Sequence, residues 1–154
     1  MTIVEYRKKA FVVYRELFRE LTELTKDLNV VISGRVKSIE SIKQKMKRKN
    51  LSIEQLNDVV GFRILSDRKN FNEIVKRIYR KFDVVEIENF FKNPTDLGYK
   101  GIHLVIWFNG FRCEIQVHTN HSCAYALLCH ELYKKNKIDG KILKILEELK
   151  RALT

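Results

Sequence analysis

The Asn109-Gly110 pair is the feature that most constrains the fold of this chain, because it separates two runs of strand-forming residues, Ile102 to Phe108 and Phe111 to Val117. Two-residue hairpin turns favour Asn-Gly, since both turn residues must adopt positive φ. The spacing therefore predicts an antiparallel hairpin. Val, Phe and Ile content predicts further strands at Val59 to Leu65 and Val84 to Phe90, so we expect a sheet of at least four strands.

Helical periodicity accounts for most of the remaining chain. From Ile3 to Leu28 apolar residues recur at spacings of three and four, which predicts one long amphipathic helix that packs in the core or across an interface in a homo-oligomer. Ser33 and Gly34 are expected to break it, and a basic helix follows around Ser38 to Arg48. The order of elements indicates a mixed α/β (α+β) domain with helices over its sheet. The other predicted helices are 70–81, 123–135 and 141–153.

The composition favours one cytoplasmic domain. A chain of 154 residues can bury a real core, and 45% hydrophobic with 32% charged residues excludes disordered and collagen-like classes. No apolar stretch reaches the roughly 18 residues of a membrane span, and charges at residues 5–9 interrupt any secretory signal. Cys113, Cys123 and Cys129 lack disulfide or zinc-finger spacing, although nearby histidines raise the zinc alternative.

Positive charge is concentrated in one segment. Thirty Lys and Arg against nineteen Asp and Glu give a net charge of +11, which favours polyanionic partners such as nucleotides, nucleic acid or anionic lipid. Residues 35–49 hold seven cations against one anion, Glu40, and so a net charge of +6.

Polar side chains alternate along the predicted strand from Arg112 to Thr119. A period of two directs Glu114, Gln116 and His118 to one face and apolar residues to the other. This pattern is typical of a functional face, and equally of an edge strand that faces solvent.

Asp58 precedes another predicted strand and, with Glu114, supplies two carboxylates. Magnesium commonly binds one or two carboxylates plus substrate phosphates, so the pair predicts a Mg²⁺ site if the two strands are neighbours. Asp58 could instead cap a helix or stabilise a turn.

The segment from Phe90 to Gly101 holds the only proline and places Tyr99 beside Lys100. An aromatic ring next to a cation suits a nucleotide base with its phosphates, although an ordinary surface loop has the same composition.

Five motifs in order resemble the synthetase domain of RelA/SpoT-type alarmone synthetases, over about residues 33–135. They are Arg35-Val-Lys37 with Ser41-Ile and Lys45, Asp58-Val-Val-Gly61-Phe-Arg63, Gly98-Tyr99-Lys100-Gly101-Ile-His103, Glu114-Ile-Gln116-Val-His118-Thr119, and His130-Glu-Leu-Tyr133-Lys134. The resemblance implies a nucleotidyltransferase-like mixed sheet of about five strands flanked by helices. It also implies transfer of the β,γ-pyrophosphate of ATP to the 3′-hydroxyl of GDP or GTP, which makes (p)ppGpp and AMP.

The resemblance further implies a role for each matching residue. Asp58 and Glu114 would hold Mg²⁺, and Glu114 would orient or deprotonate the attacking hydroxyl. The ATP-binding residues would be Arg35 and Arg63 around adenine, with Lys37, Ser41, Lys45 and Arg48 on the phosphates. The acceptor-binding residues would be Tyr99 stacked on guanine, with Lys100, His103, Gln116 and His118 nearby.

Departures from the family pattern leave the acceptor open. His118 stands where the family usually has arginine, and Asn89, Thr95 and Gly101 also differ. One alternative is a toxin-like relative that pyrophosphorylates the 3′ end of tRNA and is held by an antitoxin. Another is a catalytically dead module that binds nucleotides or RNA.

The domain boundaries follow from the same reading of the chain. We expect a small, single-domain enzyme that only synthesises, with an N-terminal helix (1–32), a catalytic core (33–135) and a C-terminal helix (136–154). None of the four histidines is followed by Asp, so the hydrolase motif of the long family members is not expected.

Overall fold

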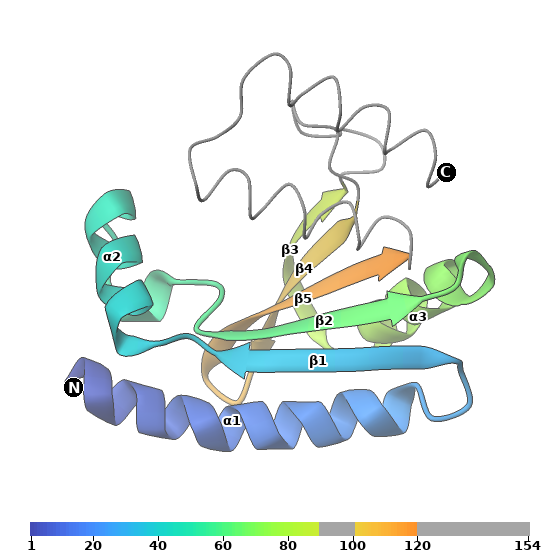
Figure 1. Ribbon diagram of the computed structural model, residues 1–154, viewed down its shortest axis with the longest axis horizontal. Coiled ribbons are helices and arrows are strands. Elements are labelled where there is room, and N and C mark those ends of the chain that lie inside the picture. The colour runs from blue at the N-terminus through green and yellow to red at the C-terminus, as the bar shows by residue number, and fades with distance from the viewer. Residues whose placement is uncertain (90–100, 120–154) are drawn as a thin grey trace, which may run out of the picture.

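A mixed sheet of five strands, in the order β1-β2-β5-β4-β3, forms the frame of the computed structural model, which describes residues 1–89 and 101–119 (Figure 1). Only β2 and β5 run parallel among these strands, and the other pairs are antiparallel. The strands are β1 Val30–Val36, β2 Val60–Ser66, β3 Asp83–Asn89, β4 Ile102–Phe108 and β5 Phe111–Thr119. The helices are α1 Ile3–Leu24, α2 Ile39–Lys49, the short 3₁₀ helix η1 Ile53–Gln55 and α3 Arg68–Lys81.

The predicted hairpin is confirmed. Asn109 and Gly110 have φ angles of 47° and 82°, as a tight turn between twisted strands requires. The β4–β5 ladder then runs from Phe108↔Phe111 to Ile102↔Val117. The predicted helices at 3–28 and 70–81 are also present, although the first ends at Leu24 and the second begins at Arg68, where Asp67 caps it.

The edge strand β1 was not predicted, because Ser33 and Gly34 were expected only to interrupt helical structure. Gly34 is instead a packing residue within the strand. A Cβ there would lie 2.5 Å from Phe62 Cδ1 and 2.8 Å from Tyr14 Cε2, closer than any side chain tolerates. These two rings stack with centroids 5.1 Å apart and planes 5° from parallel. The glycine therefore lets α1 pack closely across β1 and β2.

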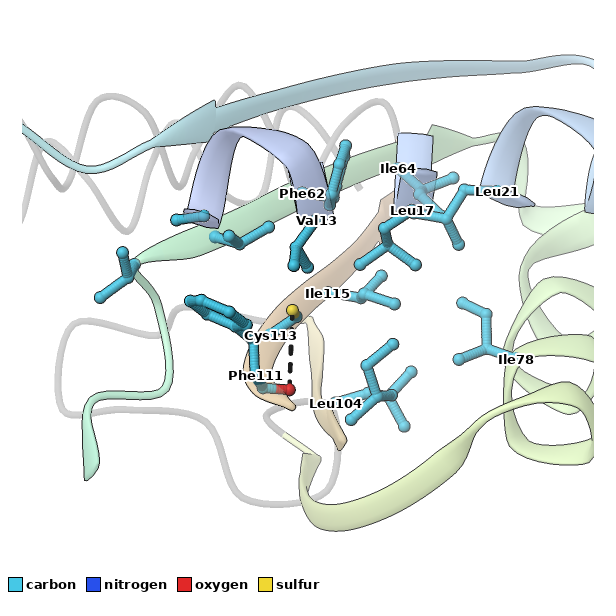
Figure 2. Packing of buried hydrophobic residues seen from close by; sticks show 14 of the residues in the cluster. Val13, Leu17, Leu21, Phe62, Ile64, Ile78, Leu104, Phe111, Cys113 and Ile115 are labelled. Carbon is cyan, nitrogen blue, oxygen red and sulfur yellow. Dashed lines mark hydrogen bonds between the residues drawn. The ribbon is translucent and has the colours of Figure 1, made fainter. Parts of the chain in front are cut away.

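The hydrophobic core lies on one face of the sheet, beneath α1 and α3. Val13, Leu17 and Leu21 of α1 and Ile78 of α3 point toward the apolar side chains of β2, β4 and β5 (Figure 2). This confirms the predicted stripe of α1, since its buried residues are Tyr6, Ala10, Val13, Leu17 and Leu21. With this face covered, the alternate side chains of the same strands are left for a site on the opposite face.

Cys113 belongs to this core, and burial raises the pKa of its thiol to about 12. A thiol that resists deprotonation is a poor zinc ligand. Within residues 1–89 and 101–119, no three His, Cys, Asp or Glu side chains cluster as a metal site, and the other two cysteines lie outside these ranges. In the same ranges, no helix has the length and apolar character to cross a membrane.

Candidate functional site

The polar face of the sheet carries two rows of side chains that cross the strands. Strand register aligns Arg35 of β1 with Gly61 of β2 and Glu114 of β5 in the first row. In the second row the aligned residues are Ser33, Arg63, Gln116, His103 and Glu88, from β1, β2, β5, β4 and β3. The alternation predicted for β5 therefore describes a face shared by neighbouring strands and not an isolated solvent-facing edge strand.

Gln116 connects the members of these rows by hydrogen bonds. Arg63 Nε and Nη2 each donate to Gln116 Oε1 at 3.4 Å, and Gln116 Nε2 donates to Glu114 Oε1 at 2.6 Å. His118 Nε2 lies 3.2 Å from the same Gln116 oxygen. Both ends of the amide are therefore occupied, and Glu114 is oriented from its own strand.

Asp58 lies in the loop between η1 and β2, where its carboxylate meets two lysines. Lys37 Nζ is 2.9 Å from Oδ2, and Lys45 Nζ is 2.8 Å from Oδ1. Burial alone would raise the pKa of this carboxyl, but the two ammonium groups outweigh burial and hold the pKa below its usual value. Asp58 is therefore ionised at neutral pH. Because Lys37 directly follows β1 and Lys45 lies on α2, the carboxylate also links these two parts of the fold.

Glu114 has the opposite electrostatic balance. Burial raises its pKa above the usual value, the hydrogen bond from Gln116 opposes that rise, and the negative charge of Asp58 adds to it. The strands β2 and β5 are parallel neighbours, so the two carboxylates lie close enough for their charges to interact. A buried carboxylate with a raised pKa is suited to accept a proton.

His103 lies beside Glu114, with Nδ1 4.0 Å from Oε1. Burial lowers the pKa of the imidazole to about 4; Glu88 opposes this, and Arg63 adds to it. His103 is therefore neutral at physiological pH and available for hydrogen bonding rather than for charge neutralisation.

The donor set fits magnesium. Asp58 and Glu114 offer hard oxygen ligands on one face, and Lys37 and Lys45 provide positive charge for phosphates. Mg²⁺ usually binds one or two carboxylates and completes its shell with water and substrate phosphates, so two carboxylates are enough.

The remaining predicted residues are distributed around this centre. Arg35 is exposed in the first row, Ser41 accepts a hydrogen bond at 2.9 Å from the Ser38 cap of α2, and Arg48 is exposed near the end of α2. His118 is fully buried, with its ring 6.1 Å from that of His103. Tyr99 and Lys100 lie outside the described residues.

Sequence reasoning missed two residues near the site. Arg7 of α1 donates through Nε to the backbone oxygen of Lys37 at 2.9 Å, a long-range contact with no local sequence signal. Arg112 shares the polar face of β5, and the alternation of that strand was a signal for it.

Solved structures share this fold. A GTP pyrophosphokinase family protein from Streptococcus pneumoniae matches with a TM-score of 0.84 and 24% identity, covering 99% of this chain and 89% of that one. Small alarmone synthetase 1 of Bacillus subtilis, bound to its product pppGpp, matches with a TM-score of 0.77 and 25% identity over 95% and 90% of the two chains. The fold is thus the mixed α+β fold of the small alarmone synthetases.

Sequence comparison identifies the family to which the chain belongs. A family model described as "Region found in RelA / SpoT proteins" matches residues 34–139. The chain belongs to the RelA/SpoT family. It is 32% identical over 117 residues to the GTP pyrophosphokinase of Escherichia coli K12, covering 71% of this chain and 16% of that protein. A probable chloroplastic GTP diphosphokinase, RSH3 of Oryza sativa subsp. japonica, is 28% identical over 68% of this chain and 16% of its own length. The chain thus spans about a sixth of these relatives.

Proposed function

We propose that this domain transfers the β,γ-pyrophosphate of ATP to the 3′-hydroxyl of GDP or GTP, giving (p)ppGpp and AMP. The observation that carries the proposal is the pair of neighbouring carboxylates, Asp58 and Glu114, in a RelA/SpoT-family domain, with Lys37 and Lys45 bound to Asp58. Relatives named GTP pyrophosphokinase and a structural relative bound to pppGpp support this reaction and acceptor.

The lysines that neutralise Asp58 would bind ATP phosphates. Lys37 and Lys45 both form ion pairs with this one carboxylate. An incoming triphosphate competes for the same ammonium groups, with Ser41 and Arg48 along α2 and Arg35 and Arg63 on either side of adenine. Arginine planes are good partners for a nucleotide base, because the guanidinium stacks on aromatic rings.

The carboxylates would then activate the acceptor. Glu114 accepts the proton of the 3′-hydroxyl while that oxygen attacks the β-phosphorus; the bond from this phosphorus to the bridging oxygen breaks, and AMP leaves. Mg²⁺, held by Asp58 and Glu114, would supply neutralisation of the charge that develops on the phosphates. Positioning and charge neutralisation do most of the catalysis, since no covalent enzyme intermediate is needed.

The acceptor nucleoside would lie on the β4 side of Glu114. Neutral His103 is adjacent to Glu114, and Gln116 is one row away from it. Together with Tyr99 and Lys100 they would recognise guanine and ribose, and the buried His118 would contribute to acceptor binding through its contact with Gln116.

The test is a transfer assay with γ-labelled ATP, Mg²⁺ and GDP, GTP, ATP or tRNA offered separately. Labelled guanosine product together with AMP is the expected result. Label in the 3′ end of tRNA at physiological salt, without a guanosine product, would establish the toxin-like alternative, for which an antitoxin partner would then be expected. Salt titration separates specific from nonspecific RNA binding, because contacts between Lys or Arg and phosphates weaken steeply with ionic strength. Absence of label in every acceptor would favour the dead binding module.

A further inference from the structure

Three side chains outside the proposed reaction machinery meet near the start of β5. Arg112 Nε donates to Asn57 Oδ1 at 2.7 Å, and Arg112 Nη2 donates to Glu86 Oε1 at 2.6 Å. Asn57 Nδ2 closes the triangle by donating to Glu86 Oε2 at 3.3 Å. This Arg112 cluster therefore joins β5, β3 and the loop that leads into β2.

Along the sequence, residues of the cluster are close neighbours of both Asp58 and Glu114. Asn57 directly precedes Asp58, and Arg112 lies two residues before Glu114 on the same face of β5. The β2–β5 ladder begins only at Val60↔Cys113, so Asn57 and Asp58 lie outside it.

Besides the ion pairs of Asp58 with Lys37 and Lys45, apolar burial and a backbone hydrogen bond hold this loop. Leu56 and Val59 are each 1% exposed, and the backbone oxygen of Val59 accepts from the Lys37 amide at 2.8 Å. Apolar burial does not fix the orientation of a loop. The N–H donors of a guanidinium group lie in one plane and therefore fix the positions of their partners. Arg112 thus supplies a directional anchor from the strand that carries Glu114.

We propose that Arg112 is a positioning residue for pyrophosphate transfer: through Asn57, it holds the loop carrying Asp58 in place relative to Glu114 on β5. The inference rests on the proposed function, because it concerns the pair of carboxylates that acts there.

The role of Arg112 is geometric rather than electrostatic. The charges that act on Glu114 are those of Asp58, Lys45 and Lys37, while Arg112 is paired with Glu86. A lysine at this position would keep the charge, but its single ammonium group cannot reproduce the planar fork to Asn57 and Glu86. Arg112→Lys should therefore behave like Arg112→Met.

A matched control is available on α3. The side chain of Arg77 is 23% exposed, against 27% for Arg112, and it also binds a carboxylate outside its own helix, that of Asp27 in the turn after α1, at 2.6 Å. Arg77 donates to the backbone oxygen of Leu24 as well, so it joins α3 to the end of α1. Arg77→Met therefore removes a comparable surface link that does not touch the Asp58 loop.

The experiment compares Arg112→Met, Arg112→Lys, Asn57→Ala, the double variant Asn57→Ala/Arg112→Met, and Arg77→Met. Transfer kinetics give kcat and the KM for GDP. Calorimetry gives the Mg²⁺ concentration needed to bind an ATP analogue with a methylene group between the α- and β-phosphates. Thermal melting and amide hydrogen exchange at residues 57–59 report on global and local stability.

Loss of an orienting contact behind a metal ligand typically costs about 10- to 100-fold in activity or metal affinity. We expect Arg112→Met to lower kcat and raise the Mg²⁺ requirement by that amount, with the KM for GDP unchanged. Exchange at residues 57–59 should rise while the Tm falls no further than in Arg77→Met. The double variant should lose less than the sum of the two single losses, because both single variants break the same bond between Arg112 and Asn57.

Equal kcat and equal Mg²⁺ requirement in Arg112→Met and Arg77→Met would overturn the proposal, as would additive losses in the double variant. If the wild-type protein labels no acceptor, the proposed function fails by itself. Arg112 is then judged by Mg²⁺-dependent analogue binding, which Arg112→Met must still weaken. A wild-type protein that binds no analogue overturns both.

Discussion

Gly34→Ala should destabilise the protein through the contact between β1 and α1. The added Cβ would lie 2.5 and 2.6 Å from two atoms of the Phe62 ring and 2.8 Å from the Tyr14 ring. Because the two rings are stacked on each other, neither can move without disturbing its partner. Overpacking of this kind typically costs about 1–3 kcal/mol. For a domain of this size each kcal/mol lowers the Tm by roughly 2–4 °C, so we expect a fall of about 2–12 °C.

Gly61→Ala is the matched control for this prediction. Gly61 lies on the neighbouring strand, and a Cβ there would meet only the backbone oxygen of Glu114, at 3.9 Å, which is ordinary contact. Its Tm should stay within about 2 °C of wild type, since substitutions free of steric conflict typically change stability by less than about 0.5 kcal/mol. Thermal melts of both variants followed by circular dichroism provide the measurement. If Gly34→Ala is as stable as Gly61→Ala, glycine at position 34 is not required by packing.

Glu114→Gln should abolish transfer without changing the Tm, because it removes one charge at nearly constant volume; AMP release measured beside a melt tests this, and activity within a few-fold of wild type would remove Glu114 from the mechanism. Asp58→Asn should raise the Mg²⁺ concentration required for half-maximal activity, and an unchanged Mg²⁺ titration would contradict its assignment as a ligand. Tyr99→Ala should weaken GDP binding by about 1–3 kcal/mol, the free energy that base stacking contributes, and leave ATP binding unchanged in titrations at saturating co-substrate. An equal loss of affinity for both nucleotides would refute the stacking role. The pKa of His103 falls from its usual 6.5 to about 4 on folding, so the unfolded chain binds more protons and stability should fall as the pH drops from about 6.5 to 4. His103→Gln should flatten that part of a denaturant-melt series, and an equally steep profile would assign the effect to other groups.

Local chemistry determined what the sequence could predict. The hairpin at Asn109-Gly110 depends on the φ preferences of two adjacent residues, and the alternation along β5 depends on one strand. Both patterns are visible in a short window of sequence. The positions of Asp58 and Glu114, before and within predicted strands, likewise predict that the two carboxylates form a pair.

Tertiary packing determined what the sequence could not predict. A glycine in a sequence usually indicates a break in secondary structure. Only the packing of the Tyr14 and Phe62 rings shows that Gly34 belongs inside a strand. The pairing of Asp58 with Lys37 and Lys45 likewise depends on how α2 folds back over the start of β2. No periodic pattern in the sequence predicts either contact.

The parallel pairing of β2 with β5 has a consequence for the order in which the protein is made. Asp58 enters the growing chain before α3, β3 and β4 are synthesised, whereas its partner carboxylate arrives with β5, the last of the described strands. During translation β1 is the only described strand that pairs with β2 before β5, so the inner edge of β2 stays open until β5 emerges from the ribosome. Closing so long a loop is entropically costly and slow. Nascent chains therefore pass through a stage with an unpaired central strand edge, which exposes them to aggregation.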